Sequence, residues 1–87
     1  MKLVYRRSFL DDVGSLPKSY RIRLEEIILT LKSATRLADI HNVKKLEGYH
    51  DYFRIRLGEY RIGVKLEGDM LVLMRCLHRR EIYRRFP

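Results

Sequence analysis

The sequence predicts an α+β fold in which an N-terminal strand and a helical hairpin pack on one face of a small, largely antiparallel sheet. Three observations predict this arrangement. Hydrophobic residues recur at helical spacing through residues 9–34, they alternate with polar residues through residues 52–66, and a continuous apolar run occupies residues 70–74. The hydrophobic period therefore changes from 3.6 residues to 2 about halfway along the chain.

The first half is predicted to contain one strand and two helices. Residues 2–6 are β-branched and aromatic, which is typical of a strand. A short helix follows and ends near Pro17, and a longer amphipathic helix covers residues 18–34. Residues 35–48 are expected to form a connection that ends at Gly48.

The second half is predicted to contain three strands and a basic tail. Residues 52–57 and 60–66 alternate between apolar and polar side chains, and Gly58-Glu59 between them suits a two-residue hairpin turn. A second turn of two or three residues at 67–69 leads into residues 70–77, which are apolar on both faces and so predict a central strand. In the tail, three larger apolar residues have roughly helical spacing: Ile82, Tyr83 and Phe86.

Length, charge and cysteine usage narrow the class of protein. The 87 residues suffice for one domain, residues 1–87, and we expect neither a secretory signal nor a membrane span. The single cysteine, Cys76, excludes an internal disulfide and is expected to be a small buried hydrophobe, so a reducing cytoplasm is the expected location. The net charge of +8 predicts binding to a polyanion such as nucleic acid.

The turn at Gly58-Glu59 places arginines opposite one another. It pairs Leu57 with Tyr60, Arg56 with Arg61, and Ile55 with Ile62. Arg54 falls on the same face as the other two arginines, opposite Gly63, where the absent side chain leaves space. Like charges directly opposite each other destabilise a sheet, so a bound anion would explain the pattern better than folding does. A guanidinium binds phosphate through two parallel hydrogen bonds. The alternative is that these strand arginines simply reach into solvent.

The tail adds groups suited to RNA. His78 can exchange a proton near neutral pH, and Tyr83 can stack on an unpaired base. Each also has an ordinary interpretation, His78 as a strand-end residue and Tyr83 as an anchor for the tail.

We expect no metal site, because the histidines and Cys76 lack ligand spacing, and no cofactor. Cleavage of a phosphodiester would then use the RNA 2′-hydroxyl as nucleophile.

Three blocks of sequence resemble the RelE/ParE toxin superfamily. They are KKLEG at 44–48, YFRIRLGEYRI at 52–62 and HRREIY at 78–83, and the preceding strand and helices match the same layout. The resemblance implies a RelE-like fold and a toxin of a toxin–antitoxin pair. RelE-like members cleave mRNA in the ribosomal A site by attack of the 2′-hydroxyl on the adjacent phosphate. An acidic, RelB-like antitoxin is the implied protein partner, and mRNA and the ribosome are the implied targets.

By position, the resemblance implies six catalytic residues. Arg54 and Arg56 match two basic residues that are usually lysines, Arg61 a phosphate-binding arginine, His78 a general acid, Arg79 an arginine near the end of the last strand, and Tyr83 a stacking tyrosine. Arginine at position 54 is a departure, because a guanidinium is a poor base. Proton transfer would then rely on His78, Tyr83 or solvent, or the enzyme would act mainly by orienting the RNA and stabilising charge. Further basic residues are expected to bind RNA or the ribosome: Lys44, Lys45, Lys65, Arg80, Arg84 and Arg85.

Two other functions stay open at this stage. The ParE branch shares the fold but poisons DNA gyrase and cuts no RNA; it lacks the His, Arg and Tyr set of the tail. A non-catalytic module could use the same arginines only to hold phosphates.

Overall fold

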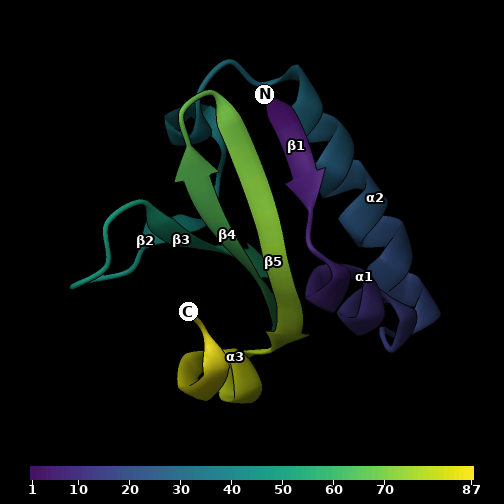
Figure 1. The fold of residues 1–87 in the computed structure, drawn as a ribbon. Coiled ribbons are helices and arrows are strands. Elements are labelled where there is room, and N and C mark those ends of the chain that lie inside the picture. The colour runs from purple at the N-terminus through teal and green to yellow at the C-terminus, as the bar shows by residue number, and fades with distance from the viewer.

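The protein forms one five-stranded sheet with three helices around it (Figure 1). A computed structural model describes all residues, 1–87. The strand order is β1-β5-β4-β3-β2; β1 runs parallel to β5, and all other neighbours are antiparallel. In chain order the elements are β1 (Lys2–Tyr5), α1 (Arg7–Gly14), α2 (Lys18–Ser33), a short 3-10 helix (Leu37–Asp39), β2 (Val43–Lys45), β3 (Tyr52–Leu57), β4 (Tyr60–Glu67), β5 (Met70–His78) and α3 (Arg79–Arg85).

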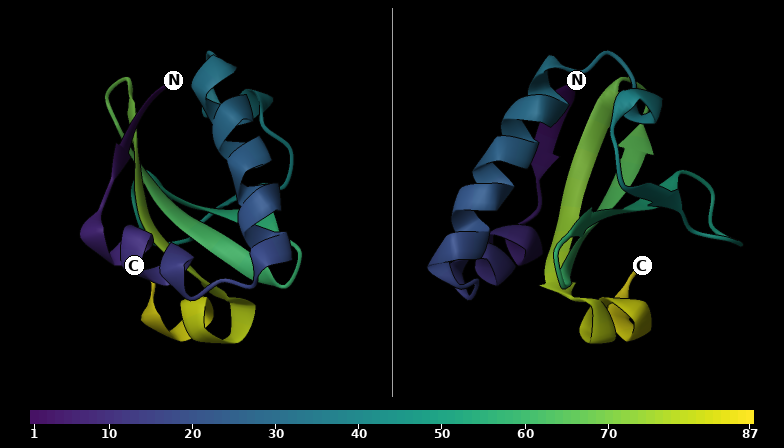
Figure 2. Two further views of the ribbon diagram at one scale, coloured as in Figure 1. Left: turned by 90° about the vertical axis from the view of Figure 1, so that its right-hand side faces the viewer. Right: turned by 180° about the vertical axis from the view of Figure 1, so that it is seen from behind.

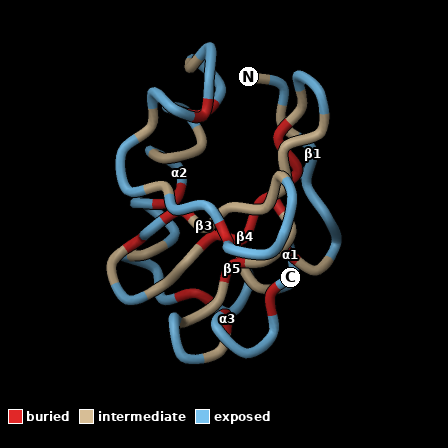
Figure 3. Tube along the Cα trace, turned by 90° about the vertical axis from the view of Figure 1, so that its left-hand side faces the viewer, coloured by how far each residue is buried: buried red, intermediate tan, exposed pale blue.

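The helices divide between the two faces of the sheet. Figure 2 shows α2 crossing one face, α1 beside it near the end of β1, and α3 apart from both at one end of the sheet. The main core fills the space between α2 and the sheet, and its buried residues recur along β3, β4 and β5 (Figure 3). A second, small cluster on the other face joins α3 to the strands through Leu46, Ile82 and Phe86.

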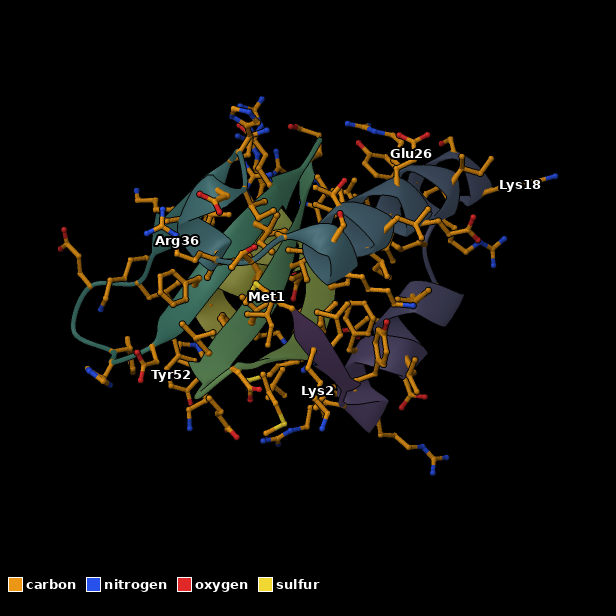
Figure 4. All side chains as sticks on the ribbon, turned by 90° about the horizontal axis from the view of Figure 1, so that it is seen from above. Met1, Lys2, Lys18, Glu26, Arg36 and Tyr52 are labelled. Atoms are coloured by element: carbon orange, nitrogen blue, oxygen red, sulfur yellow. The ribbon has the colours of Figure 1, made fainter.

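This division follows from the period of two along each strand. Ile55, Leu57 and Ile62 point into the main core, whereas Tyr52 packs with the second cluster. Seen from above, Tyr52 lies on the side of the sheet away from α2 (Figure 4). The face that α2 leaves uncovered is therefore the face of the arginines.

Beyond the end of β1, side chains of α1 form hydrogen bonds with the exposed edge of β5. The Ser8 hydroxyl donates to the Met74 carbonyl at 2.6 Å, and an Asp12 carboxylate oxygen accepts from the Cys76 N–H at 2.9 Å. The same carboxylate binds the Arg75 guanidinium through two hydrogen bonds of 2.8 and 3.0 Å. These contacts satisfy backbone groups that an open strand edge would expose.

Cys76 is buried, as the sequence predicted. Burial, followed by the negative charge of Asp12, raises the pKa of the Cys76 thiol from 9.0 to about 12. The hydrogen bonds that the Arg75 guanidinium donates to the Asp12 carboxylate also raise the pKa of Arg75 above its ordinary value, against an opposing effect of burial. Cys76 is therefore a structural thiol and not a nucleophile.

The structure confirms the predicted α+β class and most of its elements. The second turn has two residues, Gly68 and Asp69. The prediction that residues 35–48 form only a connection was wrong, because they contain the 3-10 helix and β2. A three-residue edge strand is too short to produce a recognisable alternation. None of the helices has the length and hydrophobicity required to cross a bilayer.

Candidate functional site

The hairpin of β3 and β4 has the predicted register. Arg56 lies directly opposite Arg61, and Arg54 opposite Gly63. Gly58 takes the first position of the two-residue turn with φ of +58°, a conformation that glycine adopts without strain. The turn therefore fixes which arginines meet across the two strands.

Strand β2 adds a second pair of like charges on the same face. Lys44 lies directly opposite Arg54, because β2 pairs antiparallel with β3. Two pairs of cations, Lys44 with Arg54 and Arg56 with Arg61, thus stand on neighbouring strands. Each pair is unfavourable for the sheet in isolation.

These cations line an open groove of about 550 Å³. The groove is lined by Asn42, Val43, Lys44, Arg54, Arg56, Arg61 and Tyr83. No carboxylate lies within ion-pair distance of its four cations. Five other cations in the second half of the chain do have acidic partners: Lys65, Arg75, Arg79, Arg84 and Arg85. The groove consequently carries a concentrated positive charge that no acidic side chain compensates, which suits a polyanionic ligand.

Arg61 is held in place by the hairpin itself. Its Nη1 donates to the carbonyl oxygens of Gly58 at 2.7 Å and Tyr60 at 2.8 Å. These bonds fix the plane of the guanidinium while the other nitrogens stay available to a ligand.

Tyr83 forms the wall of the groove that comes from α3. The guanidinium carbon of Arg54 lies 4.5 Å from the centre of the Tyr83 ring, a cation–π contact. Tyr83 is 52% exposed, so one side of its ring remains free to stack on a base. Of the predicted catalytic residues, the groove brings together Arg54, Arg56, Arg61 and Tyr83.

His78 does not reach the groove. It lies opposite Tyr60 across β4 and β5, and its ring meets the Tyr60 ring edge-on at 5.6 Å. Tyr60 in turn packs on Tyr20 of α2 at 4.6 Å, so His78 is on the face away from the arginines. Its Nδ1 accepts from the Arg80 N–H at 3.3 Å and caps α3. The placement does not support the predicted role of general acid, because Leu77 takes the position opposite Arg61.

The arginines of the tail lie outside the groove as well. Arg79 sits at the hairpin turn, where its N–H donates to the Glu59 carbonyl at 2.8 Å and its Nε lies 3.7 Å from the Glu59 carboxylate. Arg84 and Arg85 pair with Glu81 at 2.8 and 3.7 Å. Their charge is thus partly compensated within α3 and its surroundings, and Arg80 is exposed on the same helix.

The predicted lysines divide between different surfaces. Only Lys44 lines the groove. Lys65 pairs with Glu67 at 3.3 Å and lies over the Tyr52 ring at 5.4 Å. Lys45 pairs across the sheet with Phe53, so it is on the α2 face and borders a different cleft.

That other cleft, about 630 Å³ in volume, is apolar. It lies between the 3-10 helix and the ends of the strands, and Leu37, Ile40, Phe53 and Leu66 line it. It lacks the converging cations of the groove, so it offers no comparable site for a phosphate.

Two details of the site differ from the sequence-based expectation. The space beside Gly63 is not vacant, because the ring of Phe86 fills it. Asn42 was not predicted and lines the groove from a left-handed conformation, φ of +63°, with its carbonyl accepting from the Arg56 N–H at 2.9 Å. No pattern in the sequence distinguishes Asn42 from other polar loop residues.

Comparisons with known proteins agree with the fold. No protein-family model matches the chain. The chain is 40% identical, over 88 aligned residues covering 100% of both proteins, to Toxin RelE3 of Methanocaldococcus jannaschii. A crystal structure of the RelB–RelE antitoxin–toxin complex from Methanococcus jannaschii superposes with a TM-score of 0.84 at 37% identity, covering 97% of this chain and 99% of that chain. The archaeal RelE–RelB complex from Pyrococcus horikoshii OT3 shares the fold, with a TM-score of 0.73 at 24% identity over 90% of this chain and 93% of that chain. On sequence identity along its whole length and on its fold, the chain belongs to the RelE family of toxins.

Proposed function

We propose that this toxin is a metal-free endoribonuclease that cleaves mRNA in the groove described above. The observation that carries the proposal is a groove with four cations, no carboxylate partner and an exposed tyrosine ring. Such a set binds a phosphodiester by its charge and an unpaired base by stacking. Membership of the RelE family supports the same assignment.

The proposed reaction is an internal transfer within the RNA. The 2′-oxygen attacks the adjacent phosphorus, the bond from phosphorus to the 5′-oxygen breaks, and the products are a 2′,3′-cyclic phosphate and a 5′-hydroxyl. The proton of the 2′-hydroxyl leaves, and the departing 5′-oxygen gains one. Negative charge grows on the phosphoryl oxygens along the way, and guanidinium groups from Arg54, Arg56 and Arg61 would stabilise it.

Proton transfer is assigned to groups other than the arginines, which stay protonated. His78 faces the other side of the sheet. Among the residues that line the groove, the Lys44 amine and the Tyr83 phenol can exchange a proton, and solvent reaches both. Charge stabilisation and orientation of the RNA would supply the larger part of the acceleration.

The proposed place of cleavage is the ribosomal A site, as the family resemblance implies. An mRNA held there is single-stranded, so a base is free to stack on the exposed ring of Tyr83. The basic tail, with Arg79, Arg80, Arg84 and Arg85, would lie near ribosomal RNA and add non-specific attraction.

We further propose that an acidic antitoxin of the RelB kind holds the protein inactive. The related archaeal toxin was crystallised with RelB. A groove of unpaired cations on a chain of net charge +8 favours carboxylates from such a partner, which would occupy the place of the phosphate.

The test is incubation of the purified protein with ribosomes that translate a defined mRNA, followed by mapping of the new RNA ends. We expect cleavage within the A-site codon and a 2′,3′-cyclic phosphate on the upstream product. Arg61→Ala should reduce the cleavage rate at least about 100-fold, as loss of a transition-state donor does.

The matched control is Arg21→Ala, which removes an exposed arginine from α2 on the opposite face and should cleave normally. Intact mRNA together with gyrase-linked DNA breaks would instead favour the ParE-like activity. Salt-sensitive RNA binding without any cleavage would leave a passive nucleic-acid-binding module.

A further inference from the structure

Gly63 and Phe86 make an unusually close contact. Gly63 is buried in the middle of β4, and a Cβ built on it would lie 2.8 Å from Cγ, Cδ1 and Cε1 of the Phe86 ring. Real Cβ atoms essentially never approach other atoms so closely. Any side chain at position 63 would therefore displace the ring.

The backbone alone does not explain the glycine. Gly63 has no positive φ, and glycine inside a strand is unfavourable without a special reason. A bulge lies beside it, but the extra residue of that bulge is Met74 of β5, since Gly63 pairs with Arg75 and Val64 with Leu73. Close approach of the aromatic ring is the remaining explanation.

Phe86 is one of two side chains that anchor α3 to the sheet. Phe86 is 8% exposed and Ile82 is fully buried, and the two share the small cluster with Leu46. The Phe86 ring also meets the Tyr52 ring edge-on at 5.8 Å. These two side chains hold the C-terminal part of α3 against the strands, while the hydrogen bond from the Arg79 N–H to the Glu59 carbonyl holds its start.

The position of α3 determines where Tyr83 lies. Tyr83 follows Ile82 directly, and its ring is placed 4.5 Å from the Arg54 guanidinium carbon. Arg54 stands opposite Gly63 in the neighbouring strand. The contact of Phe86 with Gly63 and the contact of Tyr83 with Arg54 therefore lie next to each other on the sheet.

We propose that Gly63 and Phe86 are positioning residues, whose contact holds Tyr83 over Arg54 for catalysis. The inference rests on the proposed nuclease function. Neither residue lines the groove. The absence of a side chain at Gly63 leaves room for the Phe86 ring, and the contact between the two sets the distance between α3 and the arginines.

The test is a size exchange between the two positions. Gly63→Ala should lower kcat at least tenfold with little change in KM, and should shift the Tyr83 ring signals in NMR spectra as the ring moves away from Arg54. Replacing Phe86 by leucine in the same chain exchanges the rigid ring for a smaller side chain that can rotate away from the new methyl group. The double variant should therefore cleave RNA faster than Gly63→Ala alone and return the Tyr83 signals toward their original positions.

Gly14→Ala is the matched control, because a Cβ there meets nothing within 4 Å. It should leave both the signals and the cleavage rate unchanged. Full activity and unmoved Tyr83 signals in Gly63→Ala would overturn the proposal, and so would a double variant no better than the single one. The NMR comparison does not need cleavage. An inactive parent protein would therefore count against the proposed function, and the spectra alone would test whether Gly63 and Phe86 position Tyr83.

Discussion

The Arg54 guanidinium carbon lies 4.5 Å from the centre of the Tyr83 ring, and this contact joins the sheet to the C-terminal helix. Arg54 comes from β3 and Tyr83 from α3, so the groove has a wall from each. The tyrosine shields one side of the guanidinium and keeps its position without neutralising it. A phosphate bound to Arg54 would consequently have an aromatic surface beside it.

We expect RNA binding to depend on the ring of Tyr83 and not on its hydroxyl. Tyr83→Phe keeps the contact with Arg54 and the stacking surface, so RNA binding should be nearly unchanged. Tyr83→Ala removes the stacking surface and should weaken binding by about 1–3 kcal/mol, as loss of a stacked base contact does. Fluorescence titration with a short RNA measures both. Equal weakening in the two variants would contradict a stacking role.

Replacing Arg56 should stabilise the fold while it removes activity. Arg56 faces Arg61 across the hairpin, and relief of this repulsion is worth about a few tenths of a kcal/mol. Arg56→Thr should therefore raise the free energy of unfolding slightly in urea titrations and lower the cleavage rate about 100-fold. Lys2→Thr, in β1 opposite Met70, is the control strand position without a facing cation. A clear loss of stability in Arg56→Thr would show that the arginine is structural.

Asp12 should matter for stability and not for RNA cleavage. Its carboxylate accepts two hydrogen bonds from Arg75 and one from the Cys76 N–H, and its side chain is only 10% exposed. Asp12→Ala leaves these donors without a partner and should lower the free energy of unfolding by about 2–3 kcal/mol. The neighbouring exposed Asp11→Ala is the control in the same urea titration. Similar losses in both variants would disprove a special role for Asp12.

The pKa of Cys76 predicts a loss of stability in alkali. Burial and the Asp12 charge raise the pKa of the folded thiol from 9.0 to about 12. Between these values the folded protein keeps a proton that the unfolded chain releases, so stability is complete below pH 9 and falls as the pH rises. The slope reaches about 1.4 kcal/mol per pH unit. Urea titrations from pH 8 to 11 should show this fall, and the same series on Cys76→Ala should lack it. Parallel curves would contradict the assignment.

Much of the hairpin could be predicted because its information is local. The alternation in residues 52–66 and the two-residue turn determine which side chains face each other, so the opposition of Arg56 and Arg61 was predicted correctly. β2 could not be recognised, since three residues at the edge of a sheet show no period and depend on β3 for their conformation. Lys44 was therefore expected to bind RNA without any reason to place it opposite Arg54.

The errors at the tail have a different cause. The face on which His78 lies depends on the register between β4 and β5, and a bulge at Met74 changes that register by one residue. The filling of the space beside Gly63 by Phe86 is a contact between distant segments that no local pattern reports. Residues whose roles depend on tertiary packing were the ones that sequence reasoning could not place.

The parallel pairing of β1 with β5 also has a consequence for synthesis of the protein. Lys2 of β1 pairs with Met70 of β5, so the first strand to be synthesised gains a partner only after the last strand has been made. The same β5 leads into α3 and so delivers Tyr83. Completion of folding and completion of the groove therefore depend on a single late strand.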